Sequence, residues 1–80
     1  MIDITTRQPF SVSTEGDAGP YIMVPVVQLD QVTQLLDANA VPYWVDEEVI
    51  SLDGKPEVGV INLARGSNPA RVQSLLDSIP

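Results

Sequence analysis

The sequence predicts an α+β domain, a two-layer sandwich in which two helices cover one face of a mainly antiparallel sheet. Two stretches carry apolar residues at helical spacing, whereas others alternate or run continuously apolar as strands do. They follow one another in the order (β)βαββα, which is typical of separate helix and sheet layers. With 80 residues, 44% of them hydrophobic, the chain has the length of one small domain, 1–80, with its body at 20–80.

The N-terminal segment, residues 1–19, is predicted to combine an edge segment with a linker. Apolar and polar residues alternate at 2–4 and again at 10–12, so either stretch fits a short edge strand. Pro9 lies between them and would interrupt a continuous central strand. Residues 13–20 are dense in turn formers and lead into the body.

The first element of the body is a strand over 21–27. This stretch is apolar on both alternating faces, a pattern typical of strands that are buried on both sides. Pro25 cannot donate to a ladder and prefers an edge or a bulge, so it conflicts with a central position.

A helix is predicted over 29–38. Its apolar residues recur at helical spacing and are Leu29, Val32, Leu35 and Leu36. Asp30 supplies acidic charge to the first turn or acts as the N-cap. Asn39 stands where a left-handed C-terminal cap is expected, and Pro42 prevents the helix from resuming.

A hairpin follows the helix. Residues 43–52 read as a strand that the acidic triplet 46–48 interrupts, and 53–56 carry a strong turn signal. The return strand is expected at 57–63. Gly59 inside it indicates a bulge or a close backbone approach.

The last element is a helix that begins with Asn68 as N-cap and Pro69 in the first helical position. It is expected to run to about residue 79. Its apolar residues are spaced i, i+3, i+4, i+7 and are Val72, Leu75, Leu76 and Ile79. Burying all four contributes about 6–10 kcal/mol before the entropic costs.

Connection rules then determine the topology. A right-handed β-α-β crossover places the hairpin beside the first body strand. This is the ferredoxin-like arrangement without a strand after the last helix. We expect the vacant edge to be filled by the N-terminal segment or by a second subunit.

The stretch from Val32 to Leu76 resembles a family of small prokaryotic signal-transducing domains with a ferredoxin-like, nitrogen-regulator-like fold. The matching features are a helix with paired leucines, the stretch 40–43 leading into a strand, then Val60 and a short terminal helix. A glycine usually ends the first helix in that family, whereas this chain has Asn39. The resemblance implies a fold and a regulatory role but no defined activity.

The loop from Arg65 to Arg71 is the candidate anion site. Free N–H groups at a helix N-terminus attract anions, Gly66 permits close backbone approach, and Ser67 offers a hydroxyl. Arg71 lies in the first turn beside the cap Asn68, where a cation opposes the helix dipole. The alternative, which we favour, is an ordinary Asn-Pro helix start with both arginines paired to surface carboxylates.

The candidate interface lies on the sheet face without helices. Adjacent Tyr43 and Trp44 must point to opposite faces of their strand, so one of them lies on that face. Val58 and Val60 alternate with the residues expected in the core, which implies an apolar second face. A contiguous exposed patch of this kind marks an interaction surface. Alternatively, the N-terminal segment folds over it.

Composition excludes several classes of function. The chain has no cysteine and no histidine, which removes thiolate and imidazole catalysis and the usual zinc sites. A net charge of −7 makes nucleic acid an unsuitable partner. Five acidic residues cluster around the hairpin, namely Asp46, Glu47, Glu48, Asp53 and Glu57. They lack calcium-loop spacing and read as a solvated edge that protects the sheet, so no metal or cofactor is expected.

Neither a secretory signal nor an apolar run long enough to cross a membrane is present, so we expect a cytoplasmic protein without a membrane partner. The expected function is a non-enzymatic binding or regulatory module that acts through protein–protein association, as a homodimer or with another protein. The alternative is a domain that binds a small anion or a phosphorylated effector at the loop 65–71. An enzyme using carboxylates alone is the least favoured hypothesis.

Overall fold

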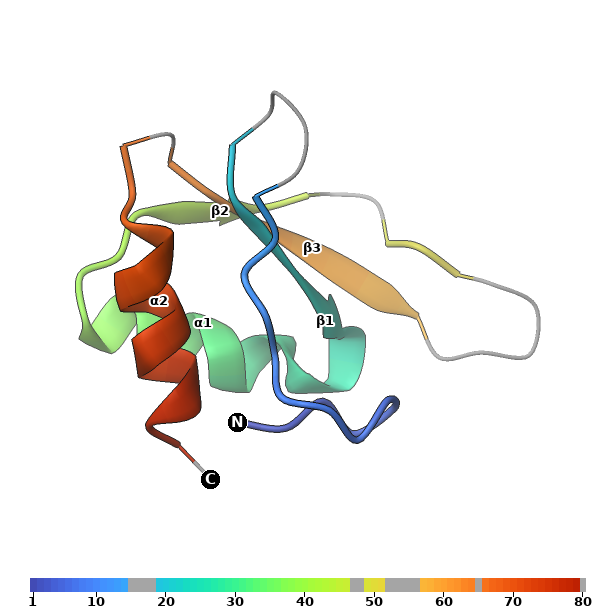
Figure 1. Cartoon of the computed structure of the whole chain (residues 1–80). Helices are drawn as coiled ribbons and strands as arrows, with labels where there is room; N and C mark the ends of the chain where they lie inside the picture. Colours follow the sequence, from blue (N-terminus) through green and yellow to red (C-terminus); the bar gives the residue numbers. More distant parts are fainter. Residues whose placement is uncertain (15–18, 47–48, 52–56, 65, 80) are drawn as a thin grey trace.

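A three-stranded antiparallel sheet carries two helices on one of its faces (Figure 1). This computed structural model describes residues 1–14, 19–46, 49–51, 57–64 and 66–79. In order, the elements are β1 (Tyr21–Pro25), the 3-10 helix η1 (Val26–Gln28), α1 (Leu29–Ala38), β2 (Tyr43–Val45), β3 (Val58–Leu63) and α2 (Pro69–Asp77). The predicted α+β class is therefore confirmed. None of the helices in the described ranges has the length and apolar character needed to cross a membrane.

The strands lie in the order β1-β3-β2, and both neighbouring pairs are antiparallel. Strand β1 is shorter than predicted, because the chain turns into η1 after Pro25. Proline has no N–H for the ladder, and Val26 makes the last bond here by donating its N–H to the Glu57 carbonyl at 3.0 Å. Pro25 therefore ends a strand at its terminus, where a proline is tolerated.

Helix α1 has the predicted range, but its ends differ from the prediction. Gln28 is the N-cap, although its side chain makes no capping bond, and Asp30 is the acidic residue of the first turn rather than the cap. Asn39 does not adopt the left-handed conformation; its φ is −108°, and the φ of 55° falls on Ala40 instead. Asn39 uses its side chain, whose Nδ2 donates to the Leu35 carbonyl at 2.8 Å.

The displacement of this cap by one residue has a packing cause. Ala40 donates to the carbonyl of Asp37 at 3.2 Å, and Val41 donates to that of Leu36 at 3.0 Å. These are the two bonds of a Schellman motif, which is accompanied by a contact between the residues at its ends. Leu36 and Val41 are both buried in the core, so this register of the turn places Val41 inside.

The hairpin prediction is confirmed in its outline. β2 and β3 pair directly, and Ile50 forms an isolated bridge with Val58 beyond the interruption. The expected turn at 53–56 lies outside the described residues. Gly59 pairs in register with Val24 and forms no bulge. It is a site of close approach, because a Cβ at this position would lie 2.9 Å from the Leu29 Cδ1.

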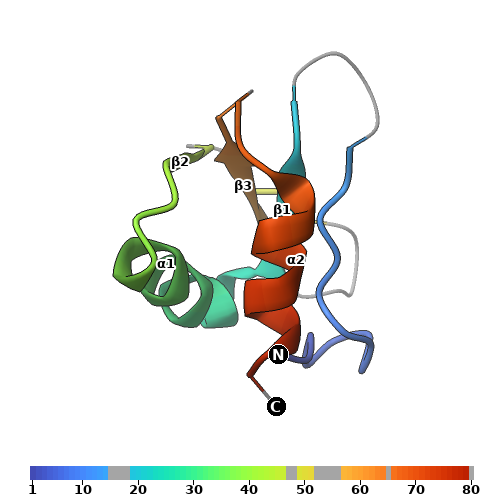
Figure 2. The ribbon, with the colours of Figure 1, turned by 60° about the vertical axis from the view of Figure 1, so that its left-hand side comes forward.

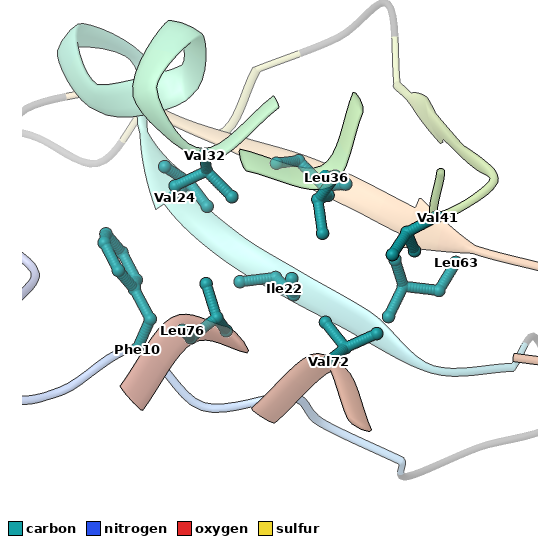
Figure 3. Close-up of a cluster of buried hydrophobic side chains, with 10 residues drawn as sticks. Phe10, Ile22, Val24, Val32, Leu36, Val41, Leu63, Val72 and Leu76 are labelled. Atoms are coloured by element: carbon teal, nitrogen blue, oxygen red, sulfur yellow. The ribbon is translucent and has the colours of Figure 1, made fainter. Parts of the chain in front are cut away.

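The core lies between the sheet and the helices. Figure 3 shows side chains from both helices meeting those of the sheet. Its ten buried apolar residues are Phe10, Ile22, Val24, Val32, Leu36, Val41, Ile61, Leu63, Val72 and Leu76. Nine of these come from the body, and only Phe10 comes from the N-terminal segment. The helical periodicity therefore predicted which side of each helix faces the core, although α2 ends at Asp77, before the predicted Ile79.

The N-terminal segment forms no regular strand in its described part. It makes isolated bridges between Ile2 and Pro9 and between Ser13 and Tyr21, and it runs along the side of α2 that faces away from α1 (Figure 2). Phe10 is only 3% exposed and packs among the core residues on the helix side. The alternative in which this segment folds over the other sheet face is therefore wrong.

Candidate functional site

The sheet face opposite the helices carries apolar side chains that the described elements leave exposed. Strand alternation and register place six side chains on it that are at least partly exposed, namely Tyr21, Met23, Trp44, Val58, Val60 and Asn62. Ile50 joins them through its bridge with Val58. We call these seven residues the open face. Trp44 is 51% exposed, Met23 44% and Ile50 43%.

Register explains why the open face is contiguous. Tyr21 and Trp44 both pair with Asn62, one from each side of the central strand. Met23 pairs with Val60 in the next row. Residues directly opposite on one face lie about 5 Å apart at Cβ, so Met23 neighbours Val60 directly, whereas Tyr21 and Trp44 flank the polar Asn62.

One polar pair lies within this surface. The Asn62 Nδ2 donates to the Asp46 Oδ1 at 2.8 Å, and the Asp46 N–H donates to the Val60 carbonyl at 3.0 Å. These bonds extend the β2–β3 pairing by one residue and hold the carboxylate at the margin of the open face.

The candidate interface residues are divided between the two faces. Trp44, Val58 and Val60 lie on the open face, whereas Tyr43 packs against the core. Burial, together with the neighbouring Asp37 carboxylate, raises the pKa of the Tyr43 phenol, and the Thr33 hydroxyl acts in the opposite direction. The adjacent aromatics therefore do point to opposite faces.

Of the open face, sequence reasoning named only Trp44, Val58 and Val60; the most exposed members that it missed are Met23 and Ile50. Met23 belongs to a stretch that is apolar on both faces, so alternation could not show which residues point outward. The partly apolar composition of 49–52 predicted a strand but not its register. The missing signal is the pairing with β3, which is a long-range property.

The candidate anion loop is built as a capped helix start. The Asn68 Oδ1 accepts bonds from the N–H groups of Ala70 at 3.0 Å and Arg71 at 3.2 Å. Asn68 is the N-cap and Pro69 the first residue of α2, as predicted. The cap oxygen therefore uses two of the N–H groups that an anion would need.

Within the described ranges, Arg71 interacts with the other helix rather than with a carboxylate. Its Nη2 donates to the Asn39 carbonyl at 2.9 Å, at the C-terminal end of α1. A cation there compensates both the unpaired carbonyls and the negative end of the helix dipole. Arg65 lies outside the described residues.

A hollow of about 360 Å³ nevertheless adjoins this loop. Gly66, Ser67, Asn68 and Arg71 line one side, and apolar residues from the α1–β2 connection, the end of β3 and α2 line the rest. The Ser67 Oγ is buried and has no hydrogen-bond partner among the described residues. Four of the five candidate anion residues therefore surround one small-molecule-sized space.

The acidic residues of the hairpin do not form a centre in the described part of the structure. Asp46 and Glu57 are exposed, and Glu47, Glu48 and Asp53 lie outside the described residues. Among the residues described, no group of three acidic side chains is close enough to hold a metal ion.

No protein-family model matches the chain, and no curated protein or solved structure matches it significantly. The resemblance to signal-transducing domains stays a prediction from the residues that carry it. Function is therefore argued from the open face and from the hollow at the start of α2.

Proposed function

We propose that this chain is a non-enzymatic binding or regulatory module that acts through protein–protein association, with the open face as its contact surface. The observation that carries the proposal is that three large apolar side chains, Trp44, Met23 and Ile50, lie about half exposed on the same face of the sheet. Large aromatic side chains in an apolar surface are the residues that contribute most to binding between proteins. A homodimer joined through this face is the simplest form of the proposal.

The arrangement of the layers supports this assignment. Both helices and Phe10 pack on the opposite side of the sheet, so the described chain offers nothing to cover the open face. Contiguous apolar patches on proteins of this size are usually interaction sites. Signal transduction, as the resemblance implies, and a cytoplasmic location remain predictions from the sequence.

The ferredoxin-like arrangement, (β)βαββα, is part of this proposal. The strand order β1-β3-β2 and the crossover helix α1 support it. So does Ser13, which exchanges two backbone hydrogen bonds with Tyr21 on the outer edge of β1, at 2.8 and 2.9 Å. That edge is where such a fold would have its remaining strand.

The first experiment measures the solution mass by light scattering after gel filtration, at several concentrations. We expect the mass to rise with concentration toward twice 8.7 kDa. Trp44 is the only tryptophan, so its fluorescence should shift to the blue as the open face becomes covered.

Two substitutions make the test specific. Trp44→Glu places a charge on the open face and should keep the chain monomeric. Ile4→Glu is the matched control, because Ile4 is 59% exposed but belongs to the N-terminal segment. A chain that is monomeric at every concentration, with the emission of a water-exposed indole throughout, refutes the homodimeric form.

The hollow at the start of α2 favours a second candidate function, the binding of a small anion or a phosphorylated effector. Arg71 supplies the charge, and the space is large enough for a metabolite. The test is a titration with a panel of phosphate-bearing metabolites, read from the amide signals of residues 66–72. Arg71→Ala should remove the shifts and Arg7→Ala should not. Unchanged signals across the panel refute this candidate.

A further inference from the structure

The N-terminal segment meets the body through the side-chain amide of Gln73 on α2. The Gln73 Oε1 accepts the Val12 N–H at 2.9 Å, and its Nε2 donates to the Phe10 carbonyl at 2.9 Å. In an extended chain, the carbonyl of residue i and the N–H of residue i+2 point to the same edge. The glutamine amide offers the matching acceptor and donor.

The same pairing occurs a second time. The buried Gln28 accepts the Ile4 N–H at its Oε1 and donates from its Nε2 to the Ile2 carbonyl, both at 2.9 Å. Both glutamines bond only backbone groups of the segment and read none of its side chains; the Gln73 Nε2 also donates to the Asp77 Oδ1 on its own helix at 3.1 Å. Ile2 and Ile4 themselves are largely exposed, so these contacts hold the path of the segment whatever its sequence.

One side chain does anchor the segment. Phe10 is buried in the core beside Leu76 (Figure 3), and Val12 packs partly against the same cluster. Ser13 then exchanges both backbone bonds with Tyr21. Residues 10–13 are thus bound by one buried aromatic side chain and by backbone bonds to two different elements.

This segment is docked onto the sheet edge rather than incorporated as a strand. Ser13 is the only residue of its described part that pairs with β1. The backbone groups of Met23, two residues after Tyr21, point to the same outer edge, and no residue in the described ranges bonds to them. Backbone pairing at an open edge combined with a side-chain pocket is how folded domains recognise extended peptides.

We propose that the outer edge of β1 and the Gln73 side of α2 together form a binding site for extended peptides, which residues 10–13 occupy in cis. The ligand in trans is an extended segment of another protein with the same chemistry. It carries an aromatic residue at the position of Phe10, a β-branched apolar residue at that of Val12, and a small polar residue at that of Ser13. This site adjoins the open face at β1 but uses the backbone edge of that strand rather than the face, so it does not depend on the function proposed there.

The probe is a blocked synthetic peptide with the sequence of residues 8–14, and its matched control has Ala in place of Phe. Both are titrated into the full chain carrying Phe10→Ala and into the unaltered chain. We read the backbone amide of Tyr21 and the side-chain amide of Gln73 by NMR. In the unaltered chain, the tethered residues 10–13 compete with the peptide for the site at a millimolar effective concentration. The Phe10→Ala chain should therefore bind the Phe peptide at least about tenfold more tightly than the unaltered chain does.

Two results overturn the proposal. One is a folded Phe10→Ala chain whose signals do not move with the Phe peptide, and the other is equal binding of the Phe and Ala peptides. If Phe10→Ala does not fold, hydrogen exchange on the unaltered chain decides. Millimolar Phe peptide should accelerate exchange at Val12 and Ser13 but not at Ile61, and unchanged protection overturns the proposal. A dimer of the unaltered chain that exchanges these segments between its subunits would assign the site to a second copy instead.

Discussion

Ala40 holds a backbone conformation that suits glycine, so Ala40→Gly should stabilise the chain. Its φ of 55° closes the Schellman motif after α1, and its side chain is exposed. The left-handed conformation costs an L-residue about 1–2 kcal/mol. Glycine avoids this cost but loses about 0.5–1 kcal/mol more backbone entropy on folding. The expected net gain in the free energy of unfolding is about 0.5–1 kcal/mol.

The assay is urea unfolding followed by circular dichroism, with an unchanged slope and a higher midpoint as the expected result. In a domain of this size the gain corresponds to a rise in melting temperature of roughly 2–8 °C. Ala38→Gly is the matched control. Ala38 is equally exposed but lies inside the last turn of α1, where glycine should destabilise by about 1 kcal/mol.

The comparison isolates the backbone conformation, because both substitutions delete the same exposed methyl group. If Ala40→Gly lowers stability as Ala38→Gly does, Ala40 is not left-handed in solution. The turn would then place its positive φ elsewhere, and Asn39 would be the first position to examine.

The remaining predictions concern the start of α2 and Tyr43. Asn68→Ala removes the cap from two N–H groups and should cost about 1 kcal/mol; Asn68→Asp, which keeps the accepting oxygen, should retain most of the stability in the same urea assay. Ser67→Ala removes a buried hydroxyl without a partner and should raise stability by up to about 1 kcal/mol, whereas a loss would show that the hydroxyl is bonded. Because the pKa of Tyr43 is raised, the folded state favours the protonated phenol. The stability this adds is complete below the ordinary tyrosine pKa of about 10 and is lost as pH rises above it. Tyr43→Phe should therefore flatten the alkaline decline in melting temperature, and an unchanged decline contradicts the assigned shift.

Local pattern was sufficient for the regular elements of the body. Helix α1 has the predicted range, and α2 begins at the predicted Asn-Pro pair. Each helix buries one apolar stripe, which the sequence displays directly at a spacing of three and four residues. The strands were found approximately, and β1 ended early because an interior proline ends pairing.

The candidate sites depended more on contacts between distant residues. The sequence indicated Trp44, Val58 and Val60 but not Met23, since the stretch around Met23 is apolar on both faces and only its pairing with β3 orients it. Likewise, the alternation of apolar residues wrongly predicted an edge strand in the N-terminal segment. Its position is set by Gln73, which lies 61 residues from Val12 in the chain.

By itself, then, the sequence of this chain determined its class, its helices and the polarity that separates core from surface. These depend on periodicity and on local turn chemistry, which act within a few residues. Tertiary structure alone decided that Ala40 rather than Asn39 takes the left-handed conformation, because burying Val41 against Leu36 determines the register of the turn. It also decided that the N-terminal segment docks on the helix side and leaves the open face uncovered. The physical reason is common to both: burial and hydrogen-bond pairing are satisfied between distant residues, and no local preference specifies which of them meet.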